Sequence, residues 1–462
     1  MIRNALCAAP LLVVASCATV GPDYSPPAIS LTSHFFGEAS APLVDAAYEQ
    51  WWTGFDDPAL NELVSRGLAQ NLSIRGARER IRQAEAALAR AGGAAQASGG
   101  ISAEALRSRD GSGSIDTHEG LTGNAAFVFD LFGGFRRGRE AAQANLDAAR
   151  QDEGTVRLAY LSDIVDAYVA ARYYQNTAWL TRQAIESRRA TLAAVNRQLT
   201  AGDATRLEVT RAEASLRTAQ ATLPPAQSGF ETNVFRIATL LAEPAGPIFE
   251  RMKAGARQPL PRRAAGSGTP ADLLRNRPDI RAAERDLAAA TASIGVAEAA
   301  LYPSLTLSGV VTDVEEHTWS FGPRLALPVF NRGFLDANRR QAVAVAAEAE
   351  LAWRATVLNA VEEVQAARAQ TIYWRRQVAA QRAAVESTTE VQALTRRSFD
   401  SGEILFSDVL DADRVSLESQ MSLAAGARDL AISWVRLQVA TGRGSQVGLT
   451  VAPTGPMPLA AN

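Results

Sequence analysis

Mostly apolar residues recur every seven positions along two long stretches of the chain, one in each half. The positions are Ala178, Ile185, Leu192 and Leu199 in the first stretch and Val357, Val364, Thr371, Val378 and Val385 in the second. This spacing predicts helices that pack against other helices along their whole length. Proline, which breaks helices, is absent between Pro58 and Pro224 and between Pro328 and Pro453. About sixty helical residues extend about 90 Å, so we expect a rod or a tube.

A second pattern, alternation of apolar with small polar residues, appears between the helical stretches. It runs from Ser304 to Val311 and again from Trp319 to Val329, and it predicts a β-hairpin with one apolar face and Arg324 on the other. The first half has a weaker counterpart. Its expected parts are strands at 101–106 and 123–131, joined by a polar connection over 107–120.

The length and the alternation of these strands suit a membrane barrel, although a soluble sheet packed on helices is the alternative. Four strands cannot close a barrel, because the smallest known barrels have about eight. Open sheet edges are not tolerated in lipid. If these strands cross a membrane, several copies of the chain must share one barrel.

The chain contains an internal repeat with an offset of 200 residues. The segment 197–220 aligns without a gap with 397–420. The matched positions are Arg197 with Arg397, Gly202 with Gly402, Glu208 with Asp408, and Ala212 with Ala412. A repeat of this kind predicts two similar halves in one elongated body.

Each long helix is expected to end at the glycine of its repeat, because glycine tolerates the left-handed C-cap that reverses the chain. Asp203, Thr205 or Glu403 then favours the start of the returning helix. Pro224-Pro225 interrupts the first returning helix, while Ala424-Ala425 stands at the matching place in the second. We therefore expect a kink or a break in the first half only.

Composition and charge narrow the possible functions. The formal net charge is −2, so nothing suggests a nucleic acid partner. No apolar run of about 18 residues follows the N-terminus, so no transmembrane helix is expected. The three histidines, His34, His118 and His317, are scattered along the chain and are expected to be surface residues. With no nucleophile motif, phosphate loop or metal cluster, an enzyme is not expected.

The N-terminus resembles a bacterial lipoprotein signal. Arg3 precedes a short apolar core, and the sequence VASC ends at Cys17. We expect a signal peptide over 1–16 and covalent acyl chains on Cys17, with no other cofactor and no metal. An ordinary signal peptide with an incidental cysteine is the alternative. The other cysteine, Cys7, lies inside the signal, so the mature chain can form no internal disulfide.

Several longer motifs are similar to those of the TolC-like outer membrane factors, in particular the lipoprotein exit ducts of tripartite efflux pumps (the OprM and NodT type). The motifs are CATVGPDYSPP at 17–27, WWTGFDDPALNELV at 51–64, FDLFGGFRR at 129–137, LLRNRPDIRAAERDLAAATASIGVAEAALYPSLTLSG at 273–309 and LALPVFNRG at 325–333. Together with the two glycine hairpins they cover nearly the whole mature chain.

The resemblance implies a fold that is mainly α with transmembrane β. Three protomers would share a 12-stranded outer membrane β-barrel, continued by a 12-helix α-barrel in the periplasm. The expected segments are the lipid-anchored N-terminal segment (17–57), helices of repeat 1 (58–98), β-hairpin 1 (99–132), the long helical hairpin of repeat 1 (133–243), an equatorial connector (244–269), a helix of repeat 2 (270–302), β-hairpin 2 (303–330), the long helical hairpin of repeat 2 (331–441) and a C-terminal tail (442–462).

The same resemblance implies a gate at the periplasmic end. Asp408 and Asp411 match the acidic residues that line the family's constriction, and Glu208 holds the equivalent place in repeat 1. In a trimer, Asp408 and Asp411 would form two rings of three carboxylates that attract cations. A solvated helix face is the alternative.

Some relatives latch the closed end with a tyrosine and an arginine, but Phe399 and Ile404 occupy those positions here. We expect Leu405, Phe406 or Leu207 to narrow the pore by apolar packing instead.

The resemblance also implies the partners and the cellular role. The hairpin tips, with Gly202, Asp203, Gly402 and Glu403, would dock a periplasmic adaptor that couples the duct to an inner membrane pump, expected to be of the RND type. The chain would be a homotrimer in the outer membrane of a Gram-negative bacterium and a passive conduit for small molecules. A duct for type I protein secretion and a lipid-anchored periplasmic coiled-coil scaffold are the alternatives.

Overall fold

The computed structural model describes residues 19–36, 42–43, 45–263, 266–313 and 317–447. The expected signal peptide, Cys17 and the tail beyond residue 447 lie outside this part. The chain divides into two compact units. The first contains residues 1–30, 77–153 and 279–357, and the second contains residues 31–76, 154–278 and 358–462.

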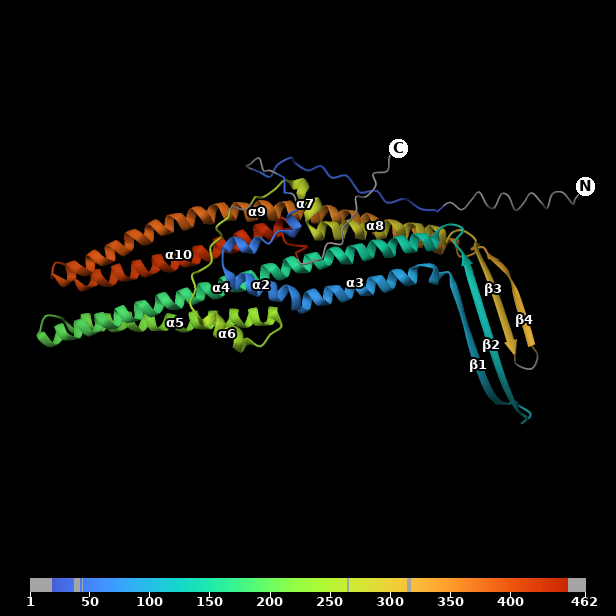
Figure 1. Ribbon diagram of the computed structural model, residues 1–462, viewed down its shortest axis with the longest axis horizontal. Coiled ribbons are helices and arrows are strands. Elements are labelled where there is room, and N and C mark those ends of the chain that lie inside the picture. The colour runs from blue at the N-terminus through green and yellow to red at the C-terminus, as the bar shows by residue number, and fades with distance from the viewer. Residues whose placement is uncertain (1–18, 37–41, 44, 264–265, 314–316, 448–462) are drawn as a thin grey trace, which may run out of the picture. The chain divides into compact units, whose positions relative to one another are not determined.

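The first unit carries a four-stranded antiparallel sheet in the order β1-β2-β3-β4 (Figure 1). The strands are β1 (Ala97–Arg109), β2 (Ile115–Phe129), β3 (Ser304–Asp313) and β4 (His317–Ala326). The helices that enter and leave the sheet are α3 (Leu72–Ala91), α4 (Gly134–Ala201), α8 (Pro278–Ala299) and α9 (Arg332–Asp400), with the short helix η4 (Gly93–Ala95) before β1. Each half of the chain thus contributes one hairpin, as the repeat predicts.

The register gives this sheet two chemically different faces. Partners across the sheet include Ile101 with Gly123, Phe127 with Leu307, and Val311 with Trp319. All registered partners are of the same parity, so odd-numbered residues share one face and even-numbered residues the other. The odd face carries Ile101, Leu121, Phe127, Phe129, Leu305, Leu307, Val311, Trp319, Phe321 and Leu325; the even face carries Ser102, Thr122, Asn124, Thr306, Ser308, Thr312, Ser320 and Arg324.

The expectation of a long polar connection in the first hairpin is wrong. Strands β1 and β2 pair as far as Arg109 and Ile115, and only a short turn remains between them. The Asp110 carboxylate closes this turn by accepting hydrogen bonds from the backbone N–H groups of Ser112 and Ser114, at 3.0 and 2.9 Å. Backbone pairing and an Asx turn therefore order residues whose side chains alone look like a loop.

The second unit is built from helices: α2 (Pro58–Gln70), α5 (Arg206–Leu241), α6 (Ala245–Lys253), α7 (Pro270–Asn276) and α10 (Phe406–Ala440), with most of α4 and α9 and the short helices η2 (Ala46–Tyr48) and η3 (Trp51–Phe55). Helices α4 and α9 contain 68 and 69 residues. The seven-residue repeat faces inward as predicted. Ala178, Ile185, Val357, Val364 and Val378 are buried.

Aromatic rings from distant parts of the chain form the main core of the second unit. Trp434 of α10 lies edge-on to Trp51 at 5.8 Å and to Phe55 at 5.1 Å between ring centroids. The indole N–H of Trp434 donates to the carbonyl of Arg263, and that of Trp51 donates to the carbonyl of Arg443, both at 3.1 Å. The N-terminal segment, the connector and the end of the described chain are thereby fixed around the helices.

Pro224-Pro225 does not break its helix. Helix α5 continues through both prolines from Arg206 to Leu241, so a break at this place is excluded. Ala219 and Ala226, on either side of the prolines, are both buried. Packing of the helix on its neighbours therefore outweighs the loss of two backbone N–H donors. In the described residues, no helix is both long enough and apolar enough to span a bilayer.

Two glycines, Gly67 in α2 and Gly76 in α3, form a matched pair that tests packing in the second unit. A Cβ atom at Gly67 would overlap the hydroxyl group of buried Tyr160, while a Cβ atom at Gly76 would meet nothing within 4 Å. We expect Gly67→Ala to destabilise the second unit by about 1–3 kcal/mol through overpacking. Gly76→Ala should stabilise it by about 0.5–1 kcal/mol, because alanine favours helix. Thermal unfolding of the purified protein, followed by circular dichroism, measures both; equal effects would contradict this packing.

Candidate functional site: the tips of the two helical hairpins

The two helical hairpins, α4–α5 and α9–α10, turn through the same hydrogen-bond pattern. At the first tip, the N–H groups of Gly202 and Asp203 donate to the carbonyls of Leu199 and Gln198, at 3.1 and 2.8 Å. At the second tip, Gly402 and Glu403 donate to Phe399 and Ser398, both at 2.9 Å. Gly202 has φ +89° and Gly402 φ +80°, which is the left-handed cap that the repeat predicts.

The returning helices begin differently. At the first tip, Thr205 is the N-cap, and its hydroxyl accepts from the N–H of Glu208 at 3.3 Å while the Glu208 carboxylate accepts from the N–H of Thr205 at 2.6 Å. At the second tip, Leu405 replaces the threonine, and only the Asp408 carboxylate accepts, from the N–H of Leu405 at 3.2 Å. Glu208 and Asp408 thus each stabilise a helix start, and the N-cap positions are held by Thr205 and Leu405 rather than by Asp203 or Glu403.

The two predicted gate carboxylates of the second repeat lie at the surface of α10. Asp408 holds the helix start, and Asp411, one turn later, lies 3.5 Å from the Arg414 guanidinium. Hydrogen bonding and attraction from Glu418, and then from Asp411, raise the pKa of Arg414. The exposed pair of Asp411 and Arg414 contributes little to stability. Both Asp408 and Asp411 are exposed and can meet solvent and ions. Their place in a pore remains a prediction.

An apolar cluster joins the two hairpins behind the tips. Phe406 of α10 is 3% exposed and packs with Val195 of α4 and with Val209 and Ala212 of α5. The ring of Phe399, at the position of the missing tyrosine latch, lies 5.7 Å from that of Phe406. The structure therefore places Phe406 in a small core and not in a pore lining.

The two other residues expected to narrow the pore, Leu405 and Leu207, are 72% and 58% exposed. Unlike Phe406, neither residue belongs to the apolar cluster, so both side chains could still line a passage.

A buried polar group next to this cluster was missed by the sequence reasoning. Asp413 of α10 is 8% exposed, and its carboxylate accepts from the Gln392 side chain at 2.7 Å and lies 3.9 Å from Arg396, both on α9. Arg188 of α4 faces the same cavity of 270 Å³ and donates to the Ser215 carbonyl at 2.8 Å. The repeat aligns Asp413 with Glu213, a signal that could have singled it out.

Electrostatics ties this polar group across the hairpins. Burial lowers the pKa of Arg188, and the Asp413 charge opposes that shift. These charges couple the two hairpins, because a buried charge that loses its partner costs free energy. The groups lie between α4, α9 and α10, behind the apolar cluster.

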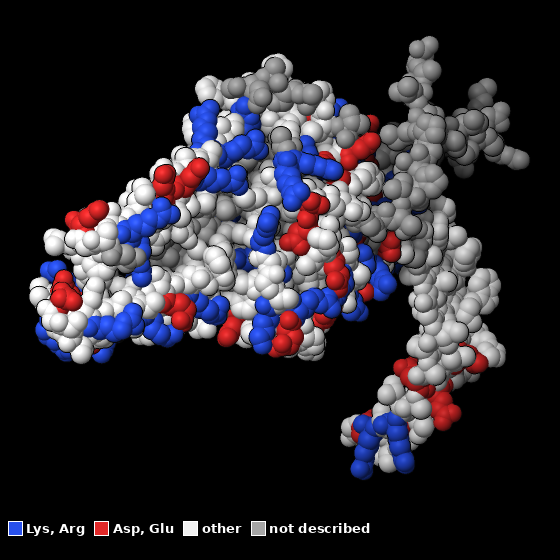
Figure 2. Space-filling model, turned by 60° about the vertical axis from the view of Figure 1, so that its left-hand side comes forward, with Lys and Arg blue, Asp and Glu red and all other residues white. Residues whose placement is uncertain are grey.

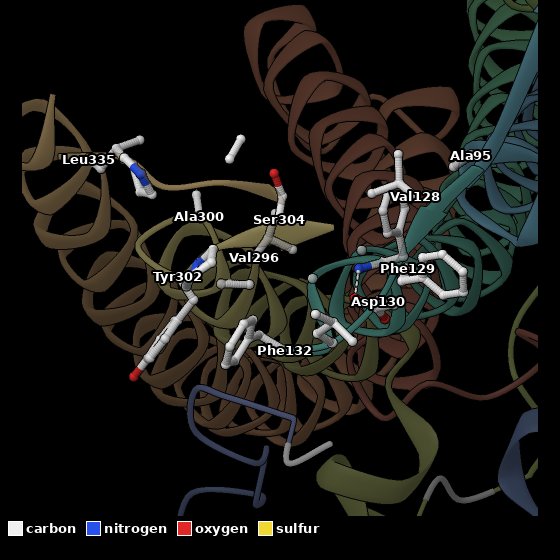
Figure 3. A pocket seen from close by; sticks show the side chains of 18 of the residues that line it. Ala95, Val128, Phe129, Asp130, Phe132, Val296, Ala300, Tyr302, Ser304 and Leu335 are labelled. Atoms are coloured by element: carbon white, nitrogen blue, oxygen red, sulfur yellow. Dashed lines mark hydrogen bonds between the residues drawn. The ribbon is translucent and has the colours of Figure 1, made fainter. Parts of the chain in front are cut away.

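A second cavity, of 780 Å³, lies in the first unit where the strands meet the helices. Phe129, Phe132, Val296, Tyr302 and Leu335 are among its mostly apolar lining residues (Figure 3). It offers no cluster of reactive groups. Among the described residues, no set of histidine, cysteine or acidic side chains is placed to hold a metal ion.

Comparison with known proteins decides what kind of molecule carries these hairpins. The family model described as outer membrane efflux protein matches the chain twice, over residues 63–243 and 269–443. The chain belongs to the outer membrane efflux protein family. The double match confirms the internal repeat, and membership of this family makes the chain an outer membrane channel that extends into the periplasm.

Individual relatives agree with this assignment. The chain is 39% identical to Nodulation protein T of Rhizobium leguminosarum bv. viciae, covering 94% of this chain and 92% of the relative. It is 31% identical to the pyoverdine export outer membrane protein OpmQ of Pseudomonas putida, covering 80% and 83%. The solved structure of the outer membrane channel OprN superimposes with a TM-score of 0.83 at 30% identity and covers 93% of this chain and all of that one. The expected fold class is confirmed.

Loss of the Phe406 ring should loosen the hairpin tips. Phe406→Ala removes a buried aromatic side chain, which costs about 3–5 kcal/mol in a core, so backbone amides of 195–212 and 399–410 should exchange faster with deuterated water. Leu405→Ala, at the exposed neighbour, should change little. The measurement is hydrogen exchange by mass spectrometry; equal exchange in the two variants would show that the cluster does not hold the tips together.

The gate carboxylates are tested without disturbing the helix start. In the double variant Asp408→Asn with Asp411→Asn, the amide oxygen at 408 can still accept from Leu405 N–H, while both charges are lost. We expect single-channel conductance in planar bilayers to rise and cation preference to fall, because a ring of like charges at a constriction attracts cations. Glu390→Gln, on the exposed side of α9, is the control. Unchanged conductance and selectivity would remove both residues from the gate.

Proposed function

We propose that the channel is a homotrimer in which three four-stranded sheets close one twelve-stranded barrel. The observation that carries this proposal is the sheet itself, since its outer strands β1 and β4 each have a neighbour on one side only within the described chain. In lipid such edges must be paired. Pairing β4 of one protomer with β1 of the next satisfies both edges and repeats around a threefold axis.

The two faces of the sheet support the same arrangement. The apolar odd face suits lipid, and the polar even face, which contains Arg324, suits a water-filled lumen. Charged side chains gather at the far end of the sheet, near the β1–β2 turn, while the strand bodies are free of them on the face that Figure 2 shows. This is the distribution expected of strands whose turn reaches water beyond the bilayer.

The lipid anchor is the second part of the proposal. Cys17 carries a diacylglycerol thioether and an N-acyl chain, supported by the short apolar core and the VASC sequence that precede it. Each buried methylene of such chains contributes about 0.8 kcal/mol. No further cofactor and no metal take part, and the protein has no enzymatic activity.

The third part concerns the partners. The exposed tips at Gly202, Asp203, Gly402 and Glu403 dock a periplasmic adaptor, which links the channel to an inner membrane pump of the RND type. Two tips with the same backbone geometry offer an adaptor two similar surfaces per protomer, six in a trimer. The channel itself is passive. Small molecules are the proposed cargo, because the name of the OpmQ relative refers to the export of pyoverdine.

Two other functions compete with this one. A duct for type I protein secretion would share the fold and differ in its partner and cargo. A lipid-anchored periplasmic coiled-coil scaffold would use the helices and leave the sheet unexplained, because the apolar odd face and the open edges would then face water. The sheet therefore favours a channel.

Neighbouring residues on opposite faces of β3 test the proposal. In a deletion strain, Leu307→Arg should abolish the heat-modifiable trimer and leave cells susceptible to dyes, detergents and antibiotics, because Leu307 lies on the lipid face near the middle of β3, where arginine costs about 2–4 kcal/mol per protomer. Ser308→Arg, on the lumen face, should assemble normally. Equal behaviour of the two variants would refute the membrane sheet. Intact drug resistance of the deletion strain, with loss of a secreted polypeptide, would favour protein secretion.

A further inference from the structure

The first described residues of the chain form a strap across the first unit, which we define as residues 19–24. The N–H of Val20 donates to the carbonyl of Phe132 at 3.1 Å. Arg137 of α4 binds the strap from the other side: Nε donates to the carbonyl of Val20 and Nη2 to the carbonyl of Gly21, both at 3.1 Å, and Nη2 also donates to the Asp23 carboxylate at 2.7 Å.

The strap fits closely against the first unit because glycine stands at two of its points of contact. Gly21, with φ +87°, faces Gly295 of α8, and a Cβ atom on Gly21 would overlap the Gly295 backbone. Gly133, with φ +79°, faces Thr19, and a Cβ atom there would lie 2.9 Å from the Cα of Thr19. Only glycine combines this approach with this backbone conformation.

Arg137 and the strap depend on each other. Arg137 is 4% exposed, and besides the strap its guanidinium binds Glu140, one turn along the same helix, at 2.8 Å. If the strap left, the guanidinium would lose three of its hydrogen bonds, two to carbonyls and one to a carboxylate. Buried charges without hydrogen bonds are costly. Hydrogen bonds to a charged group are also stronger than those between neutral groups.

The strap attaches where the sheet meets the helices. Phe132 lies three residues beyond the end of β2, and its ring stacks on that of Tyr302 with centroids 4.6 Å apart (Figure 3). The apolar odd face ends close by, at Phe129 and Leu325. Cys17 precedes Thr19 by two residues, so the Cα atoms of the two residues can lie at most about 7 Å apart. Chain connectivity alone therefore keeps a lipid on Cys17 within two residues' reach of Thr19.

We propose that Arg137 is a positioning residue for the lipid anchor. By holding the strap, it fixes the place at which the acyl chains of Cys17 enter the bilayer, at the rim of the sheet's apolar face. The anchor then keeps the open sheet at the membrane surface while protomers pair their edges, so it accelerates insertion and closure of the trimer. This inference rests on the proposed lipidation of Cys17 and on the membrane sheet.

A double-mutant cycle separates this role from a purely structural one. Arg137→Met removes the donors, and Gly21→Ala dislodges the strap without altering any helix residue. Each is made in the acylated protein and in a Cys17→Ser form exported with an ordinary signal peptide. Arg139→Met, exposed on the same helix, and Ser25→Ala, exposed just beyond the strap, are the controls. The readout is the rate at which heat-modifiable trimers form in liposomes of outer membrane lipid.

We expect both variants to slow trimer formation about tenfold in the acylated protein, the loss that about one charge-assisted hydrogen bond represents. Cys17→Ser should slow it by a similar factor, and neither variant should slow the non-acylated form further. Arg137→Lys, which keeps the charge and some donors, should recover part of the rate. Slowing by the same factor in both backgrounds would overturn the inference and leave Arg137 a structural residue.

Two direct measurements identify which premise has failed if the result is negative. Metabolic labelling with palmitate reports on lipidation; an unlabelled Cys17 would overturn both the proposed anchor and this inference. Cleavage by a protease specific for Asp, before Asp23, reports on the strap. The acylated protein and both controls should resist cleavage, while Arg137→Met and Gly21→Ala should be cut. If the acylated protein carries palmitate but is cut at the same rate as the variants, Arg137 does not hold the strap. The inference then fails, and the proposed lipid anchor stands.

Discussion

The structure depends on one constraint, that backbone N–H and C=O groups must be paired where water is absent. Within the part of the protomer that the structure describes, β2 and β3 pair on both sides and β1 and β4 on one side only. The register places one apolar face across all four strands, so this half-paired sheet faces lipid along its length. No rearrangement within a single four-stranded sheet closes its edges. Assembly with other copies follows from this constraint, and with it a lumen through which compounds can pass.

The internal repeat explains how one chain builds such a protomer. Each half supplies a β-hairpin and a long helical hairpin, and both helical hairpins reverse at a glycine with positive φ and the same two backbone hydrogen bonds. The halves have nevertheless diverged where they meet. The first returning helix starts at a threonine capping box, whereas the second has Leu405 at the cap and directs Phe406 into a shared core. A common backbone therefore carries two different tips, and the difference lies at the end where a passage would be controlled.

Two levels of interaction hold the hairpins together near the tips. The outer level is apolar and contains Phe406 and Phe399. The inner level is polar and contains Asp413, Gln392 and Arg188 around a small cavity. Apolar contacts are non-directional and survive small shifts, whereas a buried carboxylate with few partners tolerates little displacement. Where α4 begins, Arg137 ties the strap of residues 19–24 to the strand–helix junction in a comparable way.

Local and periodic features were accessible from the sequence alone: the two long helices, the left-handed glycine caps, the alternating strands, the repeat and, through long motifs, the family. These features depend on residues near one another in the chain, and their periods of seven and two are visible in it. Features set by contacts between distant segments were not accessible. The short turn at Asp110 depends on pairing across the hairpin, and the unbroken helix at Pro224-Pro225 depends on its neighbours. The core position of Phe406 and the burial of Asp413 depend on how α10 packs against α4, α5 and α9. Only the tertiary structure decides these, because the free energy is gained between residues on different strands or helices, from Arg109 with Ile115 to Val195 with Phe406, whose pairing no period in the sequence reveals.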